Sequence, residues 1–393
     1  MSLQIGIVGL PNVGKSTLFN ALTKKGVPAS NYPFCTIDPS VGIVAVPDDR
    51  LWKLSTFSKS QKTIPAAMEF VDIAGLVAGA SKGEGLGNKF LTNIRETDAI
   101  FEMVRIFPIN SLKANNGGTN SSVAGASGDD IMHVYGDIDP LRDIKVINME
   151  LILADMETVS KRLSNLAKDA RRGDKDALAE EGALKKVLPA LESEHMANTV
   201  TLDEKEIPIV KQLGLLTFKP ILYGLNKRAG VQNLDVTDAK KFKDLTDYIL
   251  STGARFVVLD AKVEDELKDF EGEEKEMFRK EMAGADTNSN EAIPEDGIDH
   301  LIKEAYALLG LETYFTTGED ETRAWTIKKG STAPVAGMAI HTDFKDKFIR
   351  AEVVFWKDLL EAGSYADARA KGKVKTEGKE YIVKDGDVIE FKI

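Results

Sequence analysis

Cysteine and histidine are scarce in this 393-residue chain, which has one Cys and four His. The single thiol, Cys35, rules out an internal disulfide and is typical of a reducing cytosol. The histidines are scattered, so they form no zinc-binding pattern with that cysteine. No apolar run approaches the length of a bilayer span, and the opening residues carry neither a basic n-region nor a cleavage site. We therefore expect a cytoplasmic protein with no membrane partner and no secretory leader.

An excess of positive charge is also absent, because 51 Lys and Arg residues face 62 Asp and Glu, giving a formal net charge of −11. Such a chain is not expected to coat nucleic acid indiscriminately, so any RNA contact must come from a local basic patch. Its length favours two or three domains. The 43% hydrophobic and 29% charged residues are ordinary for a globular protein.

What the sequence does contain is a complete phosphate-binding loop, Gly9-Leu-Pro-Asn-Val-Gly14-Lys15-Ser16. An apolar strand precedes it and a helix follows it, a setting that makes a chance match improbable. The glycines let backbone N–H groups converge on phosphate oxygens, while Lys15 reaches the β- and γ-phosphates and Ser16 offers a hydroxyl to Mg²⁺. We predict a nucleoside triphosphate site in which these residues contact the nucleotide: Asn12, Val13, Gly14, Lys15, Ser16 and Thr17.

Two further segments have the order and setting of nucleotide switches. Thr36 lies in the Pro-punctuated connector 31–39 and can close on Mg²⁺ and the γ-phosphate. Asp72 ends an expected strand over 67–72, where a carboxylate can hold the Mg²⁺ shell, and the Gly75 N–H can meet the γ-phosphate. We predict Ser16, Thr36 and Asp72 as metal ligands, and Lys15 and Gly75 as catalytic groups. Leu76 follows where Ras-type GTPases use glutamine, which predicts slow intrinsic turnover.

The base-reading segment departs from the GTPase pattern. An expected strand from Pro220 ends in Asn226-Lys227-Arg-Ala229, whereas GTPases carry Asn-Lys-x-Asp, whose aspartate accepts both guanine donors. With Ala229 in the fourth position, strong selection for GTP has no visible source. Asp260 and Ala261, after the strand expected over 255–259, form the last loop expected to border the base. We predict that four residues contact the nucleotide on this side: Asn226, Lys227, Asp260 and Ala261.

Together these motifs resemble the Obg-like ATPase family of the YchF type. The resemblance covers nearly the whole chain through five segments: 9–16, 31–39, 72–87, 171–176 and 323–393. It implies a GTPase-like α/β core that accepts ATP at least as well as GTP, hydrolyses it slowly and associates with the ribosome, either its large subunit or the whole particle, and with RNA. That family carries Asn-x-x-Glu at the base site, so Ala229 departs from this pattern as well.

The resemblance also places a catalytic histidine at His133, which would position the attacking water in place of the missing glutamine. From the residues alone, a surface histidine in a flexible segment is the favoured interpretation of His133. It follows a low-complexity segment, 110–128, whose composition predicts a flexible insert. Asn12 resembles the asparagine of K⁺-dependent relatives, which makes K⁺ a candidate ion beside Mg²⁺. Asparagine is also simply a good turn former.

The fold class predicted is α/β: a P-loop NTPase core with an inserted α-helical hairpin and a C-terminal β-grasp module of the TGS type. The expected boundaries are 1–140 plus 206–307 for the nucleotide domain, 141–205 for the hairpin and 308–393 for the TGS domain, in a monomer. Heptad-spaced apolar residues indicate the hairpin. Exposed basic residues are expected near its tip: Lys161, Arg162, Lys168, Arg171, Arg172, Lys175, Lys185 and Lys186. Interleaved acids make this either a solvated helix surface or an RNA-facing arm.

The function predicted is a nucleotide-dependent switch that binds and slowly hydrolyses ATP and associates with the ribosome. Two alternatives remain open. One is an Obg-type GTPase, which places a different base in the same site. The other is a ribosome- or RNA-binding adaptor that uses nucleotide as an effector with little turnover, a reading that Leu76 supports.

Overall fold

The computed structural model describes residues 3–24, 38, 40–73, 86–108, 138–270, 274–275, 277–279 and 297–393. Three of the predicted site residues, Thr36, Gly75 and His133, lie outside this part of the chain. So do Cys35 and Leu76, together with the segment 110–128.

The first of two sheets carries the phosphate loop. Its strand order is β2-β4-β1-β5-β6-β7, with β2 antiparallel to β4 and the other neighbours parallel. The strands are β1 Gln4–Val8, β2 Val41–Ala45, β4 Ala67–Asp72, β5 Ala99–Arg105, β6 Ile221–Asn226 and β7 Arg255–Leu259. The central strands β1, β5 and β6 are buried along almost their entire length, as parallel strands covered on both faces must be.

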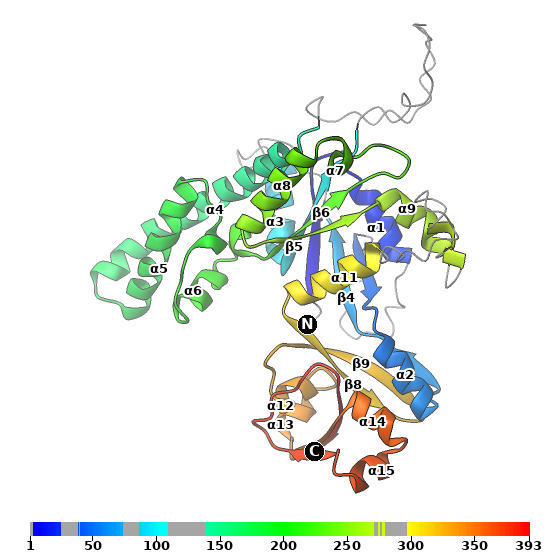
Figure 1. The fold of residues 1–393 in the computed structure, drawn as a ribbon. Coiled ribbons are helices and arrows are strands. Elements are labelled where there is room, and N and C mark those ends of the chain that lie inside the picture. The colour runs from blue at the N-terminus through cyan, green and yellow to red at the C-terminus, as the bar shows by residue number, and fades with distance from the viewer. Residues whose placement is uncertain are drawn as a thin grey trace, which may run out of the picture.

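Helices cover both faces of this sheet, with α1 and α11 on one side and α4 and α8 on the other (Figure 1). The helices of this part are α1 Lys15–Lys24, α3 Leu86–Glu96, α7 Leu234–Thr237, α8 Ala239–Ser251, α9 Ala261–Glu266 and α11 Gly297–Leu308, with short 3-10 turns η3 Ala197–Thr199, η4 Leu216–Phe218 and η5 Leu267–Asp269. Within the described residues, no helix is long and apolar enough to cross a bilayer.

The predicted helical hairpin projects from this core (Figure 1). It consists of α4 Pro140–Arg171 and α5 Lys175–Glu192, with α6 Glu206–Gln212 packed against α5. Gly173 turns the chain between the two long helices at φ 81°, a backbone conformation that suits glycine. Asp174 then caps α5 by accepting hydrogen bonds from the Asp176 and Ala177 N–H groups. Along the predicted apolar seam, Ile152, Val159 and Leu166 are buried.

The second sheet has the order β11-β10-β12-β8-β9-β3. Its strands are β3 Lys62–Ile64, β8 Leu311–Thr317, β9 Glu321–Lys328, β10 Arg350–Phe355, β11 Lys375–Glu377 and β12 Asp387–Lys392. The accompanying helices are α2 Asp49–Ser58, α12 Ala333–Gly337, α13 Asp343–Asp346, α14 Trp356–Ala362 and α15 Tyr365–Ala370. Tyr314, Phe348 and Phe391 lie in a separate hydrophobic core of this region.

One strand of the second sheet comes from the first part of the chain. Although β3 lies in sequence between β2 and β4 of the first sheet, it pairs in parallel with β9. The preceding helix α2 packs on β8 and β9, and its Arg50 forms ion pairs with Asp48 and with Asp385, 2.8 Å and 2.5 Å away. Residues 49–64, within the range that the sequence assigned to the nucleotide domain, therefore tie the two sheets together.

Candidate nucleotide-binding site

The phosphate loop joins the end of β1 to the start of α1 and contains three residues with positive φ. These are Gly9 (150°), Asn12 (65°) and Gly14 (102°). A Cβ at Gly9 would lie 2.5 Å from the Met103 carbonyl oxygen, and one at Gly14 would lie 2.6 Å from Asn226 Nδ2. Both positions therefore require glycine on conformational and steric grounds. Asparagine is the non-glycine residue that best tolerates the conformation found at position 12.

Lys15 places a buried ammonium group within this loop. Its side chain is 8% exposed, and its Nζ donates hydrogen bonds to the carbonyl oxygens of Gly9 (3.1 Å) and Leu10 (2.9 Å). Burial lowers the pKa of Lys15, and the nearby Asp72 carboxylate opposes that shift. A partly desolvated cation at a helix N-terminus, beside converging N–H groups, is suited to a phosphate anion.

Asp72 and Ser16 supply oxygen atoms beside Lys15. Asp72 is the last residue of β4 and is in register with Ile7 of β1, so it ends next to the start of the loop. Burial raises the pKa of Asp72, and Lys15 partly offsets the increase. The Ser16 side chain is exposed in the first turn of α1. A carboxylate and a hydroxyl are oxygen donors of the kind that Mg²⁺ prefers, so these residues fit that ion.

Asn226 connects the phosphate loop to the opposite end of the site. It ends β6 and is 4% exposed. Its Nδ2 donates to the Val13 carbonyl oxygen at 2.8 Å, and its Oδ1 accepts from the Ala261 N–H at 3.0 Å. The side chain thus holds two loops of the site with its two ends. This positioning role was not visible in the sequence, which indicated only a base contact.

Asp260 reaches across to the segment that carries the unexpected alanine. Its Oδ2 accepts from the Ala229 N–H at 2.5 Å, and its Oδ1 accepts from the N–H groups of Lys262 (3.0 Å) and Val263 (3.1 Å), capping α9. The Lys227 N–H donates to the Leu259 carbonyl at 2.8 Å, which joins the two base-side loops further. The sequence placed Asp260 near the base but gave no signal of its bond to residue 229.

The predicted residues that the structure describes gather at one edge of the first sheet. The phosphate-side set follows β1, Asp72 ends β4, Asn226 ends β6 and is followed by Lys227, and Asp260 and Ala261 follow β7. This is the carboxyl edge of the parallel strands, where ligands of open α/β sheets bind. Asn12, Val13, Gly14, Lys15, Ser16 and Thr17 occupy consecutive positions there.

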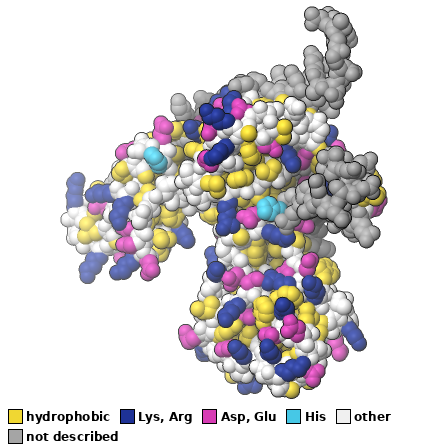
Figure 2. All heavy atoms as spheres, viewed as in Figure 1, with side chains coloured by type: hydrophobic (Ala, Val, Ile, Leu, Met, Phe, Trp, Pro, Cys, Tyr) yellow, Lys and Arg dark blue, Asp and Glu magenta, His cyan; other side chains and the backbone are white. Residues whose placement is uncertain are grey.

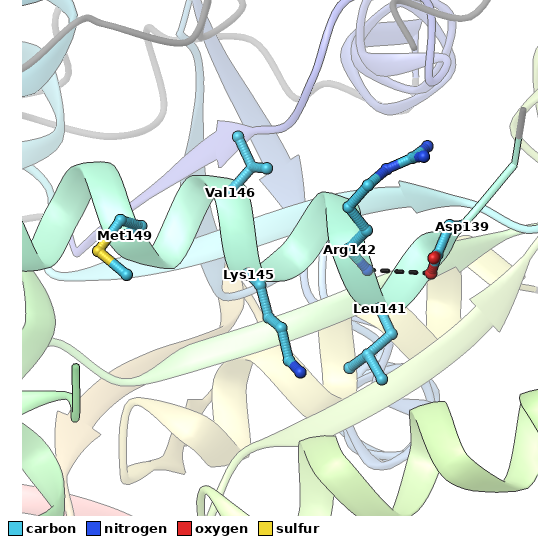
Figure 3. Close-up of a pocket in the computed structure, with 6 residues that line it drawn as sticks. All are labelled: Asp139, Leu141, Arg142, Lys145, Val146 and Met149. Carbon is cyan, nitrogen blue, oxygen red and sulfur yellow. Dashed lines mark hydrogen bonds between the residues drawn. The ribbon is translucent and has the colours of Figure 1, made fainter. Parts of the chain in front are cut away.

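A hollow of about 460 Å³ lies along the first turns of α4 (Figure 3). Figure 3 shows Arg142 and Val146 projecting from one side of the helix and Leu141 and Lys145 from the other. Asp139 caps this helix by accepting from the Arg142 N–H at 3.1 Å. The described residues that line the hollow include none of the predicted nucleotide contacts, so the hollow is not the candidate nucleotide site.

The hairpin forms a second surface of interest. Figure 2 shows Lys and Arg side chains gathered on it with acidic groups among them. All eight predicted basic residues are exposed. Four of them form ion pairs, namely Arg162 with Glu180, Arg172 with Asp169, Lys185 with Glu181 and Lys186 with Glu206. Within the described residues no ion pair is found for the other four, which are Lys161, Lys168, Arg171 and Lys175.

Comparison with known proteins agrees with this geometry. Residues 4–125 match a family model described as 50S ribosome-binding GTPase. Residues 311–393 match the model of the C-terminal region of YchF GTPases, described as a protein of unknown function (DUF933). The fold and the phosphate loop thus define a P-loop nucleotide-binding protein of the GTPase type.

Relatives that are similar over the whole chain indicate which family of P-loop proteins it resembles. The "Ribosome-binding ATPase YchF" of Bacillus subtilis is 51% identical over 392 residues, covering 100% of this chain and 99% of that protein. "Obg-like ATPase 1" of Gallus gallus is 41% identical over 398 residues, covering 100% and 92%. The solved structure of the Schizosaccharomyces pombe YchF GTPase superposes with a TM-score of 0.81 at 35% identity, covering 100% and 98%. The chain belongs to the YchF, or Obg-like ATPase, family.

Proposed function

We propose that this protein is a nucleotide-dependent switch that binds ATP, hydrolyses it slowly and associates with the ribosome. The observation that carries the proposal is the phosphate loop, in which Gly9, Asn12 and Gly14 adopt positive φ around the buried Lys15 ammonium. Relatives similar over the whole chain are named ribosome-binding ATPases, which supports the ribosome as partner. We further propose that the protein acts as a cytoplasmic monomer.

In the proposed reaction, water attacks the γ-phosphate while residues of the loop stabilise the developing negative charge. Lys15 and the loop N–H groups bind the phosphate oxygens, Gly75 senses the γ-phosphate, and His133 positions the water. Mg²⁺, when bound, would neutralise negative charge on the phosphates. Ser16, Thr36 and Asp72 are the proposed residues that hold it. Asn12 is the candidate contact for K⁺, which a comparison of hydrolysis in K⁺ and Na⁺ at equal ionic strength tests.

On the base side, Asn226, Lys227, Asp260 and Ala261 are the proposed contacts. Equilibrium titration of the purified protein with non-hydrolysable ATP and GTP analogues, with Mg²⁺ and at fixed salt, tests the choice of nucleotide. Tighter binding of the ATP analogue supports the proposal. A clear preference for the GTP analogue would favour an Obg-type GTPase instead, because the base would then be read by groups other than those proposed here.

We propose that the hairpin contacts ribosomal RNA through Lys161, Lys168, Arg171 and Lys175, the basic residues that form no ion pair within the described part of the chain. Removing a phosphate-binding cation weakens binding and reduces its salt dependence. The double variant Arg171→Ala and Lys175→Ala should therefore sediment less with ribosomes, with a shallower salt dependence. The matched control is Lys240→Ala with Lys241→Ala on α8, which removes the same number of exposed charges away from the hairpin. Equal loss in both would indicate a nonspecific charge effect.

Leu76 favours one alternative of another class, an adaptor whose nucleotide sets ribosome affinity but is barely turned over. Phosphate release measured with and without ribosomes separates the two functions. Acceleration by ribosomes supports the switch that hydrolyses ATP. Unchanged release, together with a ribosome affinity that still depends on bound nucleotide, supports the adaptor.

A further inference from the structure

A cavity of about 280 Å³ lies between the two base-side loops. Its lining includes Lys227, Ala229 and Gly230 from the segment after β6, with Asp260 and Val263 from the start of α9. Asn226 bonds both the phosphate loop and the first residue of α9, so it ties the phosphate loop to a helix whose first turn lines this cavity. Its position is that of a pocket for the base of the nucleotide.

Two carboxylates line this cavity: Glu264, which accepts from Arg279 and from the Gly297 N–H, and Asp260, which comes from an unexpected position. The fourth residue of the base-reading segment, Ala229, has no carboxylate, but its backbone N–H donates to Asp260 Oδ2 at 2.5 Å. The Asp260 side chain, which belongs to the other loop, is therefore in hydrogen-bond contact with the residue where an acid is missing. Asp260 is 8% exposed, so its carboxyl group is largely shielded from water.

The hydrogen bonds already made by Asp260 limit what else it can accept. A carboxylate has roughly four lone-pair sites, two on each oxygen. Within the described residues, Oδ1 accepts from Lys262 and Val263, and Oδ2 accepts from Ala229, so these bonds leave a single lone-pair site on Oδ2. Guanine presents N1–H and N2–H₂ side by side and needs two free acceptors. Adenine presents only its 6-amino group on that edge and needs one.

We propose that Asp260 is the base-reading acid of this protein, replacing the acid absent at position 229, and that it accepts one hydrogen bond from the 6-amino group of adenine. The inference rests on the proposed function, because it requires a nucleotide in the site. It identifies the substrate class as a 6-aminopurine nucleotide and explains how the base can be selected despite Ala229.

The test compares the affinities of two protein forms for two ligands, so that the contribution of the 6-amino group is measured with and without Asp260. Wild type and Asp260→Ser are each titrated at equilibrium with ATP and with purine riboside triphosphate, which lacks the 6-amino group. Serine retains an oxygen that can cap α9, so the fold should survive. For the wild type, removing the amino group should weaken binding about tenfold, the size of one good hydrogen bond to a charged acceptor. For Asp260→Ser, ATP should bind about tenfold more weakly and the two ligands should bind alike.

Two further variants serve as a control for the loss of a helix cap and as a test of base preference. Asp238→Ser removes a capping aspartate from α8, where it accepts from the Lys241 N–H at 3.0 Å, and should leave both affinities unchanged. Adding Ala229→Asp to Asp260→Ser returns a carboxylate with free lone pairs and should raise GTP affinity relative to ATP. Thermal melting of each variant reports whether it is folded.

The outcomes separate the inference from the function on which it rests. If the wild type binds ATP but the amino group contributes equally in wild type and Asp260→Ser, Asp260 does not read the base and the inference is overturned. If the folded wild type binds no triphosphate at all, the proposed function fails and the inference fails with it. Loss of the amino-group effect in Asp260→Ser alone, with Asp238→Ser unchanged, supports it.

Discussion

The two ends of the candidate site are built in different ways. At the phosphate end, the site is formed by backbone conformation and one buried cation. Gly9, Asn12 and Gly14 have positive φ angles, and the Lys15 ammonium group lies within the loop that they form. At the base end, side-chain bonds between separate loops create the geometry, through Asn226 and Asp260. Phosphates are common to all nucleotides and can be bound by a fixed local motif, whereas the base differs and is read by groups from several loops.

The two ends of the site should therefore differ in how well they tolerate substitutions. A phosphate loop fails when any one of its local requirements fails, because the backbone cannot be replaced. A base pocket can exchange the source of a functional group, provided that another loop brings an equivalent group to the same place. Asp260 beside Ala229 is an arrangement of this kind. Substitutions at the two ends should therefore have separable effects on nucleotide binding.

The largest effect is expected from Lys15→Met. It removes the cation that we propose stabilises charge on the phosphates, so the rate of ATP hydrolysis should fall about 100- to 1,000-fold. Folding should persist, because methionine avoids the burial of a charge. Phosphate release under saturating ATP measures this. Lys24→Met, at the exposed end of the same helix, is the control and should retain activity. Unchanged hydrolysis in Lys15→Met would exclude the proposed role of this loop.

Asn226→Ala should damage both ends together. It leaves the buried Val13 carbonyl and the Ala261 N–H without their partner, at a cost of about 3 kcal/mol in the free energy of unfolding. Denaturant unfolding measures this cost. Affinity for ATP, GTP and pyrophosphate should all fall, since the phosphate loop itself is released. Asn233→Ala removes bonds within the base-side loop alone, so pyrophosphate binding should remain. Equal pyrophosphate loss in both variants would contradict the linking role of Asn226.

Gly14→Ala should act mainly on the phosphate end. The added Cβ would meet Asn226 Nδ2 at 2.6 Å in a backbone with φ 102°, which should cost about 2 kcal/mol of stability and weaken ATP and GTP alike. Gly182→Ala in α5 is the control, because no atom lies within 4 Å of its Cβ position and alanine favours helices. It should gain up to about 1 kcal/mol. A changed ATP-to-GTP ratio in Gly14→Ala would weaken the distinction between the two ends.

The smallest effect on the site is expected from Glu102→Gln in β5. Burial, and then the Asp143 charge, raise the pKa of Glu102 well above 4.5, so the folded protein binds this proton more tightly than the unfolded chain. The associated stability is present below pH 4.5 and is lost as pH rises through the folded pKa, by at most about 1.4 kcal/mol per pH unit. Glutamine stays neutral, so the variant should gain stability over the wild type as pH rises.

Unfolding free energies of the Glu102→Gln variant and the wild type between about pH 5 and pH 8 measure this difference. The exposed Glu96→Gln is the control and should follow the wild type. Nucleotide affinities and the ATP-to-GTP ratio should remain unchanged, because Glu102 is not among the proposed site residues. A shift in that ratio would show that the buried group also affects the base end.

Sequence alone predicted the parts of the fold whose signals are local. The strands 67–72 and 255–259 have the predicted bounds, and the hairpin follows from its apolar spacing. The phosphate loop was recognisable because its glycines, lysine and serine must stand at fixed spacing. Thr36, Gly75 and His133 lie outside the described residues and remain predictions.

The phosphate loop, the strand and helix on either side of it and the apolar seam of the hairpin can be read from the amino-acid order, because each depends on backbone preferences or on a short periodic pattern. Three features are seen only in the folded chain: β3 joins the second sheet through β9, Asn226 holds two loops, and Asp260 accepts from the Ala229 N–H. These contacts join residues far apart in the chain. Their partners are chosen by the packing of whole elements, and no local pattern records that choice.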